Sequence, residues 1–468
     1  MLSIDTIIGR PIYTQLYWQI RQKIMSGEWI VNAKLPSSRQ LANDLQISRN
    51  TVEQAYQQLC AEGYLYSKSR QGYYVGKLEG PFINQNACNT SSTVNNNISC
   101  SNEKDQYRYD FRYGKLDYKY VPSKIWKKLM IQCFEEEVDK NVSYGEPQGE
   151  IGLREQIMKY VEEYRGVKCQ PEQIVIGAGT LHCLGLLCNI LRQFTSTVAF
   201  EDPGYGKTRA VLHNAGFQVC PISVESDGIN VQELANSEAL AVYVTPSHQF
   251  PTGAIMSISK RLQLLEWAVR KQAIIIEDDY SCHLRYNVRP IPALQGISPM
   301  ANVVYFGNFS KPLLPSLRIA FMILPPSLLN VYKTLYRTYN TSVPYLYQRT
   351  LERFMEEGYW NRHLRRVLQV YKKKHECLMQ SLKEQFCDLI AIHGNNAGLF
   401  ITIKVNSHLF ETDLIQRAAG YGVRVYPVSE HWQRIYKYDR KTVLLGYSSL
   451  DLEEIKQAVR LLRKAWFD

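Results

Sequence analysis

The sequence predicts an α/β protein in which a large domain with a mainly parallel sheet follows a small helical domain. Three observations support this prediction. Short β-branched runs alternate with helical stretches over most of the chain, as in βαβ units. The first 76 residues instead contain three amphipathic helical patterns. Between the two parts, residues 84–106 are rich in Asn and Ser and have too few large apolar groups to offset the entropy of ordering.

The composition is that of a globular protein, with 468 residues, 45% of them hydrophobic and 21% charged. No apolar run approaches the ~18 residues that cross a bilayer, and the start lacks a signal-peptide pattern. We therefore expect a cytoplasmic protein without a membrane partner. The eleven cysteines have no paired spacing, which favours reduced thiols and no metal site. The net charge of +11 is compatible with nucleic-acid binding, but residues 1–76 hold eight basic and five acidic residues, so charge alone is weak evidence.

The small part is expected to contain three helices and a hairpin. Apolar residues recur every four positions over 12–26, which predicts the first helix. A second helix is expected to begin near Ser37, and a third at Ser48, which is a good N-cap. The following stretch alternates like a hairpin, with Lys68 and Arg70 near its tip. This layout indicates a winged helix-turn-helix, although three short helices could also form a structural or protein-binding module.

The segments PIYTQLYWQIRQKIMSGEW, LPSSRQLANDLQISRNTVEQAYQQLCAEGYL and SRQGYYV together resemble the GntR-type winged helix-turn-helix. This resemblance implies that double-stranded operator DNA is a partner. The residues that it implies as DNA contacts are Arg39, Ser48, Arg49, Asn50, Thr51, Lys68 and Arg70. Arg39 and Arg70 are expected to contact phosphates, whereas the start of the third helix is expected to supply specificity.

In the long part, buried strands are expected at 174–176, 198–200, 240–245, 273–277, 302–306 and 318–324. Residues able to carry chemistry follow two of them. Lys311 comes after a strand and a turn, where a lysine of lowered pKa can form a Schiff base with an aldehyde. Asp278 and Tyr280 lie at the carboxyl end of a strand, where α/β folds place ligands and where an Asp can hold a pyridine nitrogen protonated. Each motif alone is weak, because acidic strand ends also bind magnesium.

Three further motifs suggest where an anion and a planar ring bind. The stretch IVIGAGTLHCLGLL predicts a strand, a glycine turn and a helix, which aims the N–H groups of Gly179, Thr180 and Leu181 at an anion. Tyr205 ends the EDPGY motif and is placed to stack on a ring. Arg318 follows Lys311 by seven residues and can bind a phosphate with both arms of its guanidinium.

From Val142 to the end, the sequence looks like a fold-type I aminotransferase, and the whole chain is similar to the MocR family, within it to the γ-aminobutyrate-sensing branch. The pieces that carry the resemblance are YGEPQGEIGLRE, RGVKCQPEQIVIGAGT, EDPGY, TPSHQFPTG, EDDY, FSK, LRIAF and NAGLF. It implies pyridoxal 5′-phosphate as the cofactor. By this match Lys311 holds the aldimine, Asp278 the ring nitrogen and Tyr280 the ring oxygen; Tyr205 stacks, and Gly179, Thr180, Ser310 and Arg318 bind the phosphate.

The resemblance also implies a homodimer in which each DNA-binding domain leans on the partner's large domain. The expected domains are a winged helix-turn-helix at 1–77, a flexible linker at 78–108 and an aminotransferase-like domain at 109–468.

One departure bears on function. Phe250 stands where aminotransferases usually carry the Asn of an NPTG motif, so efficient transamination is in doubt. We expect a regulator that senses an amino compound through aldimine exchange at Lys311. In such a regulator the aminotransferase-like domain is expected to have at most weak transaminase activity, limited to a partial reaction. Two alternatives stay open: a regulator that senses pyridoxal phosphate itself to control vitamin B6 synthesis, and a true pyridoxal-phosphate-dependent aminotransferase.

The resemblance also points to effector-binding residues. The γ-aminobutyrate sensors hold the ligand carboxylate with two arginines, and the matched positions here carry Lys207 and Glu430. If the second match slips, Arg424 or Arg434 takes that place. Lys207 keeps the charge without the bidentate fork, and Glu430 reverses the charge. We therefore expect γ-aminobutyrate to be a poor effector.

Overall fold

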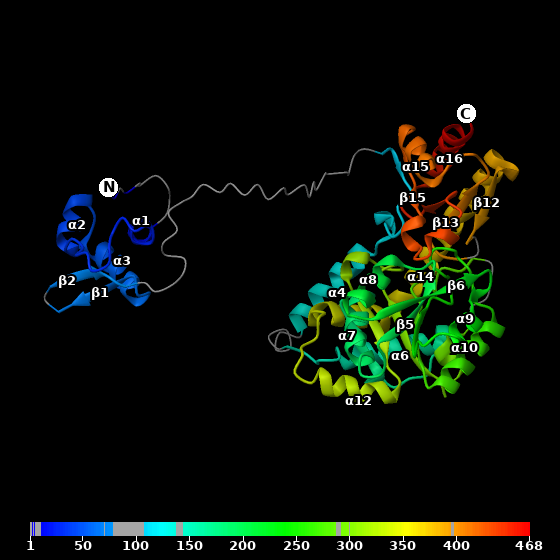
Figure 1. Ribbon diagram of the computed structural model, residues 1–468, viewed down its shortest axis with the longest axis horizontal. Coiled ribbons are helices and arrows are strands. Elements are labelled where there is room, and N and C mark those ends of the chain that lie inside the picture. Colours follow the sequence, from blue (N-terminus) through cyan, green and yellow to red (C-terminus); the bar gives the residue numbers. More distant parts are fainter. Residues whose placement is uncertain are drawn as a thin grey trace. The chain divides into compact units, whose positions relative to one another are not determined.

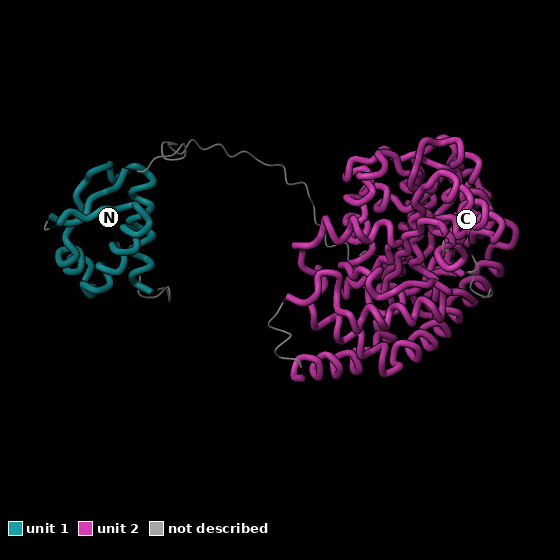
Figure 2. The backbone as a smooth tube through the Cα atoms, turned by 90° about the horizontal axis from the view of Figure 1, so that it is seen from below, with its two compact units in different colours: residues 1–101 teal, residues 102–468 magenta. Residues whose placement is uncertain are grey.

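The computed structural model describes residues 2, 4, 11–69, 71–77, 107–136, 144–286, 292–298, 300–394 and 397–468. The chain divides into two compact units, residues 1–101 and 102–468, which Figure 2 shows in different colours. Arg70 and all but the last two residues of the predicted linker 78–108 lie outside the described residues. Within the described parts, none of the helices combines the length and the apolar character needed to cross a bilayer.

The first unit has three helices followed by a hairpin, as predicted (Figure 1). Its elements are α1 (Ile12–Met25), α2 (Ser38–Leu45), α3 (Arg49–Ala61), β1 (Leu65–Lys68) and β2 (Gly72–Val75). The side chains of Ser37 and Ser48 cap α2 and α3 by accepting hydrogen bonds from backbone N–H groups of the first turn. Apolar side chains from all three helices and both strands form one core, which fixes the hairpin beside α3.

The second unit is built on an eight-stranded sheet, and every strand expected in the long part belongs to it. The order is β4 (Ile174–Gly177), β11 (Ala320–Ile323), β10 (Asn302–Asn308), β9 (Ile274–Asp278), β8 (Ala241–Val244), β5 (Thr197–Asp202), β6 (Gln218–Glu225) and β7 (Gly228–Ile229). The pairs from β10 through β6 are parallel, whereas β11 runs antiparallel to both of its neighbours. The mainly parallel sheet is thus confirmed, and β6 and β7 are additional strands.

Helices cover both faces of this sheet (Figure 1). One face packs against α7 (Thr180–Leu191) and α12 (Pro326–Leu335), and the other against α6 (Ile151–Arg165), α10 (Ile258–Lys271) and α13 (Tyr345–Glu356). The remaining helices of this region are α4 (Ser123–Glu136), α8 (Gly206–Asn214), α9 (Val231–Ala235) and α11 (Leu294–Ile297). Because both faces are covered, the parallel strands are apolar on both sides.

A second, smaller sheet follows the long helix α14 (Tyr359–Phe386) and was not predicted from the sequence. Its order is β12 (Ile390–His393), β13 (Phe400–Val405), β16 (Thr442–Gly446) and β15 (Tyr426–Pro427). Helices α15 (Glu411–Gly420) and α16 (Leu452–Phe467) pack on it, and the short strand β14 (Val423–Arg424) pairs with β3 (Tyr109–Asp110) from the start of the unit. The start of the unit therefore lies against its carboxy-terminal part.

Candidate functional site

A cavity of about 330 Å³ lies at the carboxyl ends of the central strands, within the range of small-molecule sites. Its lining includes almost all of the predicted cofactor residues. The lining residues are Tyr113, Gly114, Thr180, Leu181, Tyr205, Lys207, Thr208, Thr245, Phe250, Asp278, Tyr280, Asn308, Ser310, Lys311, Pro315 and Arg318. The fold therefore brings together residues that are up to 205 positions apart in the sequence, from Tyr113 to Arg318.

Lys311 projects its amine into this cavity. Its Nζ lies 3.5 Å from the centroid of the Tyr113 ring. Burial lowers the pKa of Lys311 to about 7, although the attraction of Asp278 acts in the opposite direction. Near neutral pH a large share of this amine is therefore uncharged, which is the form that attacks an aldehyde carbon.

Asp278, the last residue of β9, has one oxygen free for a ligand. Its Oδ2 accepts a hydrogen bond from the hydroxyl of Tyr243, and its Oδ1 is buried with no hydrogen-bond partner among the described residues. Burial raises the pKa of Asp278 to about 7, while the Tyr243 hydrogen bond lowers it. A buried carboxyl oxygen without a partner is costly, and a protonated pyridine nitrogen has the chemistry to supply that partner.

The other end of the cavity is suited to an anion. Gly179 caps α7 with a φ of +96°, and a Cβ there would overlap the Arg318 guanidinium, so only glycine lets that arginine pack against the helix start. Asn308 joins the neighbouring groups: its side chain donates to the Thr180 hydroxyl at 3.5 Å and accepts from the Ser310 N–H at 3.2 Å. A helix N-terminus, a guanidinium and hydroxyl groups together favour a phosphate.

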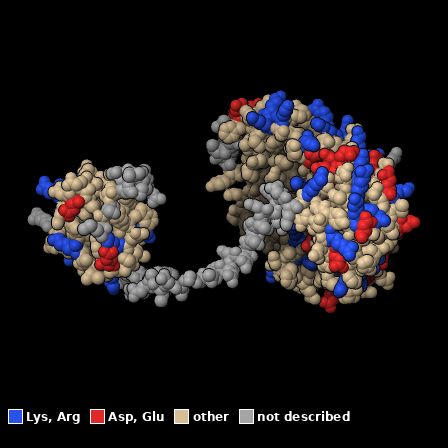
Figure 3. All heavy atoms as spheres, turned by 90° about the horizontal axis from the view of Figure 1, so that it is seen from above, with Lys and Arg blue, Asp and Glu red and all other residues tan. Residues whose placement is uncertain are grey.

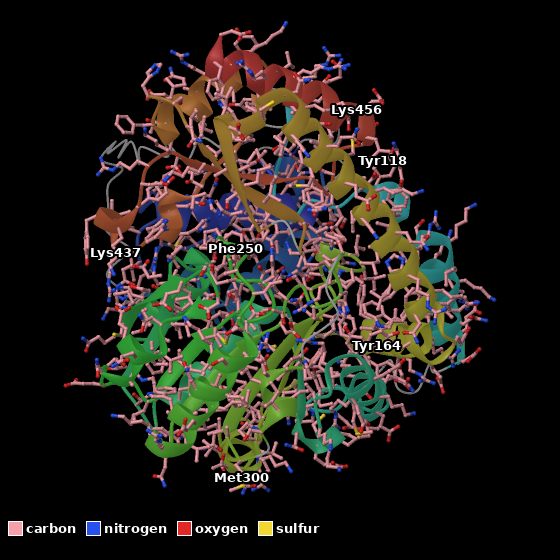
Figure 4. The ribbon with its side chains drawn as sticks, turned by 90° about the vertical axis from the view of Figure 1, so that its right-hand side faces the viewer. Tyr118, Tyr164, Phe250, Met300, Lys437 and Lys456 are labelled. Atoms are coloured by element: carbon pink, nitrogen blue, oxygen red, sulfur yellow. The ribbon has the colours of Figure 1, made fainter. Side chains whose placement is uncertain are left out.

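Aromatic rings form the wall between these two ends. Phe250 is buried inside the unit, between the large sheet and the carboxy-terminal elements (Figure 4). Its ring centroid lies 5.3 Å from those of Tyr113 and Tyr205 and 5.0 Å from that of Phe400. Tyr280 donates its hydroxyl hydrogen to the backbone oxygen of His248 at 2.6 Å. At the position of the usual Asn, Phe250 thus contributes ring packing in place of a hydrogen bond.

Among the residues at this site that were not predicted from the sequence are Tyr113 and Tyr243. Tyr243 could have been found from strand alternation, because it precedes the TPSHQF turn and its side chain lies on the same sheet face as Ile276. Tyr113 lies outside the regular elements, and no periodic pattern marks it. Only the tertiary fold brings its ring to Lys311.

The effector candidates divide clearly. Lys207 lines the cavity from the first turn of α8. The Glu430 side chain is 63% exposed and does not belong to the described lining; its Oε1 lies 3.5 Å from Nε2 of His431. Arg434 pairs with Glu233, and Arg424 lies over the rings of Tyr107 and Tyr426. Lys207 therefore lines the cavity, whereas the Glu430 side chain is mostly exposed and the Glu430 backbone lies next to the first turn of α8.

Of the predicted DNA contacts that the structure describes, Ser48 to Thr51 lie at the start of α3, Arg39 lies in the first turn of α2 and Lys68 ends β1. Arg39, Arg49 and Asn50 are exposed, and Nε of Arg49 pairs with Glu53 at 2.8 Å. Ser48 and Thr51 hydrogen-bond to each other at 2.8 Å, so these hydroxyls also serve the helix cap. Lys68 lies over the Tyr74 ring at 4.9 Å. On the face seen in Figure 3, basic and acidic side chains are mixed.

Family comparisons agree with this division of the chain. Residues 12–75 match the family described as bacterial regulatory proteins, gntR family, and residues 111–440 match aminotransferase class I and II. Among curated proteins, an uncharacterized HTH-type transcriptional regulator, YdeL of Bacillus subtilis (strain 168), is 38% identical over 99% of this chain and 98% of its own length. A probable rhizopine catabolism regulatory protein, MocR of Rhizobium meliloti, is 31% identical over 100% of this chain and 96% of its own.

Solved structures show the same fold in the second unit. A kynurenine aminotransferase from Pyrococcus horikoshii matches with a TM-score of 0.69 and 23% identity, covering 78% of this chain and 91% of that one. An α-aminoadipate aminotransferase from Thermus thermophilus, solved with N-(5′-phosphopyridoxyl)-L-leucine, matches with a TM-score of 0.68 and 23% identity over 77% and 92%. At this identity the likeness establishes the fold alone.

Proposed function

The chain belongs to the MocR-type family of helix-turn-helix transcriptional regulators, and we propose that it reports a primary amine to DNA through pyridoxal 5′-phosphate held in the cavity. One observation carries the proposal: a buried lysine of lowered pKa shares a cavity with an unpartnered carboxyl oxygen of Asp278. When bound, the cofactor supplies an aldehyde that reacts with primary amines. The first unit supplies the contact with operator DNA.

The residues present fit this cofactor. Lys311 provides the amine that attaches to it, and Asp278 provides an acceptor for the ring nitrogen. Tyr205 and Tyr280 line the same cavity, where Tyr205 would stack on the ring and Tyr280 would bond the ring oxygen. The helix start at Gly179 to Leu181, together with Ser310 and Arg318, provides the phosphate end.

Titration of the full-length protein tests the function as a whole. Pyridoxal phosphate is added first, followed by primary amines, while the absorption spectrum and the affinity for DNA are recorded. We expect an amine to change both the absorption spectrum and the affinity for DNA. The change in DNA affinity can be no larger than the difference in the amine's affinity for the two conformations of the protein. A response of DNA affinity to the cofactor, with no further response to any amine, would favour control of vitamin B6 synthesis. Continued conversion of the amine to a carbonyl product would favour an aminotransferase, against which Phe250 argues.

We further infer a homodimer with exchanged DNA-binding units, a linker at 78–108 and a cytoplasmic location. Large apolar side chains of the second unit support an interface, since Phe134 is 57% and Tyr144 is 82% exposed. Sedimentation of the full chain measures the oligomeric state, and a fragment of residues 1–77 that binds DNA as tightly as the whole chain would argue against paired units.

Replacing Arg49 is expected to weaken DNA binding strongly. Its side chain is 61% exposed at the start of α3, where it can leave Glu53 and bind a base edge or a phosphate. Arg49→Ala should cost about 1–3 kcal/mol if the contact is a base, with relaxed sequence preference. If it is a phosphate, all sequences should weaken alike and the salt slope should fall by about one.

Arg270→Ala is the matched control. Arg270 is likewise exposed and paired at helical spacing, with Glu266, but it lies in the second unit. Its removal should leave DNA affinity within experimental error. Equal losses in the two variants, or none in Arg49→Ala, would show that the recognition helix is assigned to the wrong element.

Lys207→Arg is expected to improve the response to γ-aminobutyrate. Of the proposed effector residues, Lys207 is the one at the cavity, and arginine would add a two-pronged contact to a carboxylate. We expect about a five- to tenfold gain in affinity for γ-aminobutyrate, measured by spectral titration, and no gain for butylamine, which lacks the carboxylate. Tight binding of γ-aminobutyrate by the unchanged protein would contradict the expectation that it is a poor effector.

A further inference from the structure

The first described segment of the second unit, residues 107–114, runs along the carboxy-terminal part of the unit. Its last two residues, Tyr113 and Gly114, lie beside the amine of Lys311. We call this segment the strap. Its backbone is held at successive points: Tyr109 donates to Gly422 at 3.1 Å, and Phe111 donates to Arg424 at 3.0 Å and accepts from Gly446 at 2.8 Å. The Phe111 side chain is fully buried in the core of that sheet. The strap is therefore a well-packed element of this unit.

Little space separates the strap from its neighbours. A Cβ on Gly446 would lie 2.6 Å from the backbone of Tyr113, so glycine is required for this approach. Side chains add to the contact, because the Tyr426 hydroxyl donates to Asp110 at 2.7 Å and accepts from Nε of Arg112 at 3.0 Å. Because these contacts are close, Tyr113 cannot shift without displacing the rest of the strap.

At its end the strap meets the reactive amine. The Lys311 Nζ lies over the Tyr113 ring at 3.5 Å from the centroid, and a Cβ on Gly114 would lie 3.2 Å from the same nitrogen. An ammonium at this distance is attracted by the face of the ring. A nitrogen that is bonded to a ligand carbon has fewer hydrogens to turn toward that face, so the contact must weaken when Lys311 is attached.

We propose that Tyr113 is the positioning residue that holds the unattached amine of Lys311, and that the strap passes the loss of this contact toward the DNA-binding unit. This inference rests on the proposed function. It adds a physical route, because the strap is the part of the second unit that comes first in the chain after residues 12–75, which match the gntR family. Attachment of Lys311 and the position of the strap are then energetically coupled, so that each affects the other.

The first test measures the amine without any cofactor. Lys311 of the full-length protein is labelled with acetic anhydride over a range of pH, and the extent is read by peptide mass spectrometry. Besides Lys311, three charged residues in the described part of the chain line the cavity: Asp278, Arg318 and Lys207. Of these, Asp278 favours the protonated form of the Lys311 amine. Tyr113→Leu should move the midpoint of labelling to lower pH by about one unit, since the ring no longer favours the ammonium. Tyr113→Phe, which keeps the ring, should restore it.

The second test measures coupling with a DNA duplex that the unchanged protein selects from a randomised pool. The ratio of DNA affinities with and without pyridoxal phosphate should fall toward one in Tyr113→Leu and be kept in Tyr113→Phe. Tyr118→Leu is the matched control, because Tyr118 is 79% exposed on the outside of the same unit (Figure 4).

The outcomes separate the two proposals. An unmoved labelling midpoint in Tyr113→Leu overturns the role of Tyr113, whatever the DNA result. A moved midpoint with an unchanged DNA ratio overturns the coupling through the strap. Absence of any cofactor effect on DNA in the unchanged protein overturns the coupling through the strap. Absence of any effect of primary amines on DNA binding by the cofactor-loaded protein overturns the proposed function, while the labelling result still decides whether Tyr113 holds the amine.

Discussion

Lys311→Ala is expected to remove all covalently held cofactor while leaving the protein folded. The residue lines a cavity and supplies the amine whose pKa is lowered to about 7, and its side chain makes little contribution to the apolar clusters of the unit. Treatment with borohydride fixes the link between an amine and an aldehyde. After denaturation, the unchanged protein should therefore carry one cofactor per chain, and the variant should carry none above background.

The same lysine sets a pH dependence for attachment. Because its pKa is lowered, the amine loses its proton as the pH rises through about 7, and only the uncharged form attacks the aldehyde. The attachment rate should increase between pH 6 and 8 and then level off, whereas an ordinary lysine would show an increase up to about pH 10. Stopped-flow absorption after mixing with pyridoxal phosphate measures this rate.

Lys311→Arg is the control for charge. It keeps a cation in the cavity, cannot attach to the aldehyde, and should behave like the alanine variant after borohydride treatment. Retention of cofactor after denaturation in either variant would show that another lysine is the attachment site. Equal melting temperatures of the three proteins without cofactor would exclude a general loss of folding.

The parts of this fold that the sequence predicted are those with strong local signals. The strand expected at 273–277 is present and ends at Asp278, and Ser48 caps the third helix as expected. Both could be predicted because apolar runs and capping are signals that extend over only a few residues. The same holds for Gly179, whose glycine turn directly precedes a helix. The antiparallel direction of β11 was not predicted, since pairing direction leaves no local pattern. The small carboxy-terminal sheet was also missed: β15 has only two residues, but the apolar runs of β13 and β16 are strand signals that could have been recognised.

The parts of the site that could not be predicted depend on distant packing. Tyr113 and Lys311 are 198 positions apart, and their contact exists only because the strap is held by Gly422, Arg424 and Gly446. For Lys374, distant packing buries a residue that the local sequence suggests is exposed. It occurs in a run of three lysines that suggests a solvated helix face, yet it is 3% exposed and pairs with Asp117 at 3.0 Å. Helical spacing predicts on which face of a helix a residue lies, but not which other part of the chain packs against that face.

Asp278→Asn is expected to have the second large effect, on cofactor affinity. The carboxylate loses its charge while its size and its contact with Tyr243 can be kept, so the ring nitrogen loses a buried ionic partner. Loss of one partner of such a pair costs about 2–5 kcal/mol, which corresponds to at least a thirtyfold weaker affinity for pyridoxal phosphate. Equilibrium dialysis measures it. Tyr243→Phe, which removes only the hydrogen bond to Oδ2, should have a smaller effect.

The same variant has an opposite effect on the protein without cofactor, and this separates a binding role from a structural one. Burial raises the pKa of Asp278 to about 7, so the folded protein keeps a proton that the unfolded chain releases near pH 4. Stability therefore falls as the pH rises from about 4 to 7. Asn cannot ionise, and Asp278→Asn should melt at an equal or higher temperature than the unchanged protein at pH 8. Unchanged cofactor affinity would contradict the assignment of Asp278 to the ring nitrogen, and a lower melting temperature at pH 8 would contradict the raised pKa of Asp278.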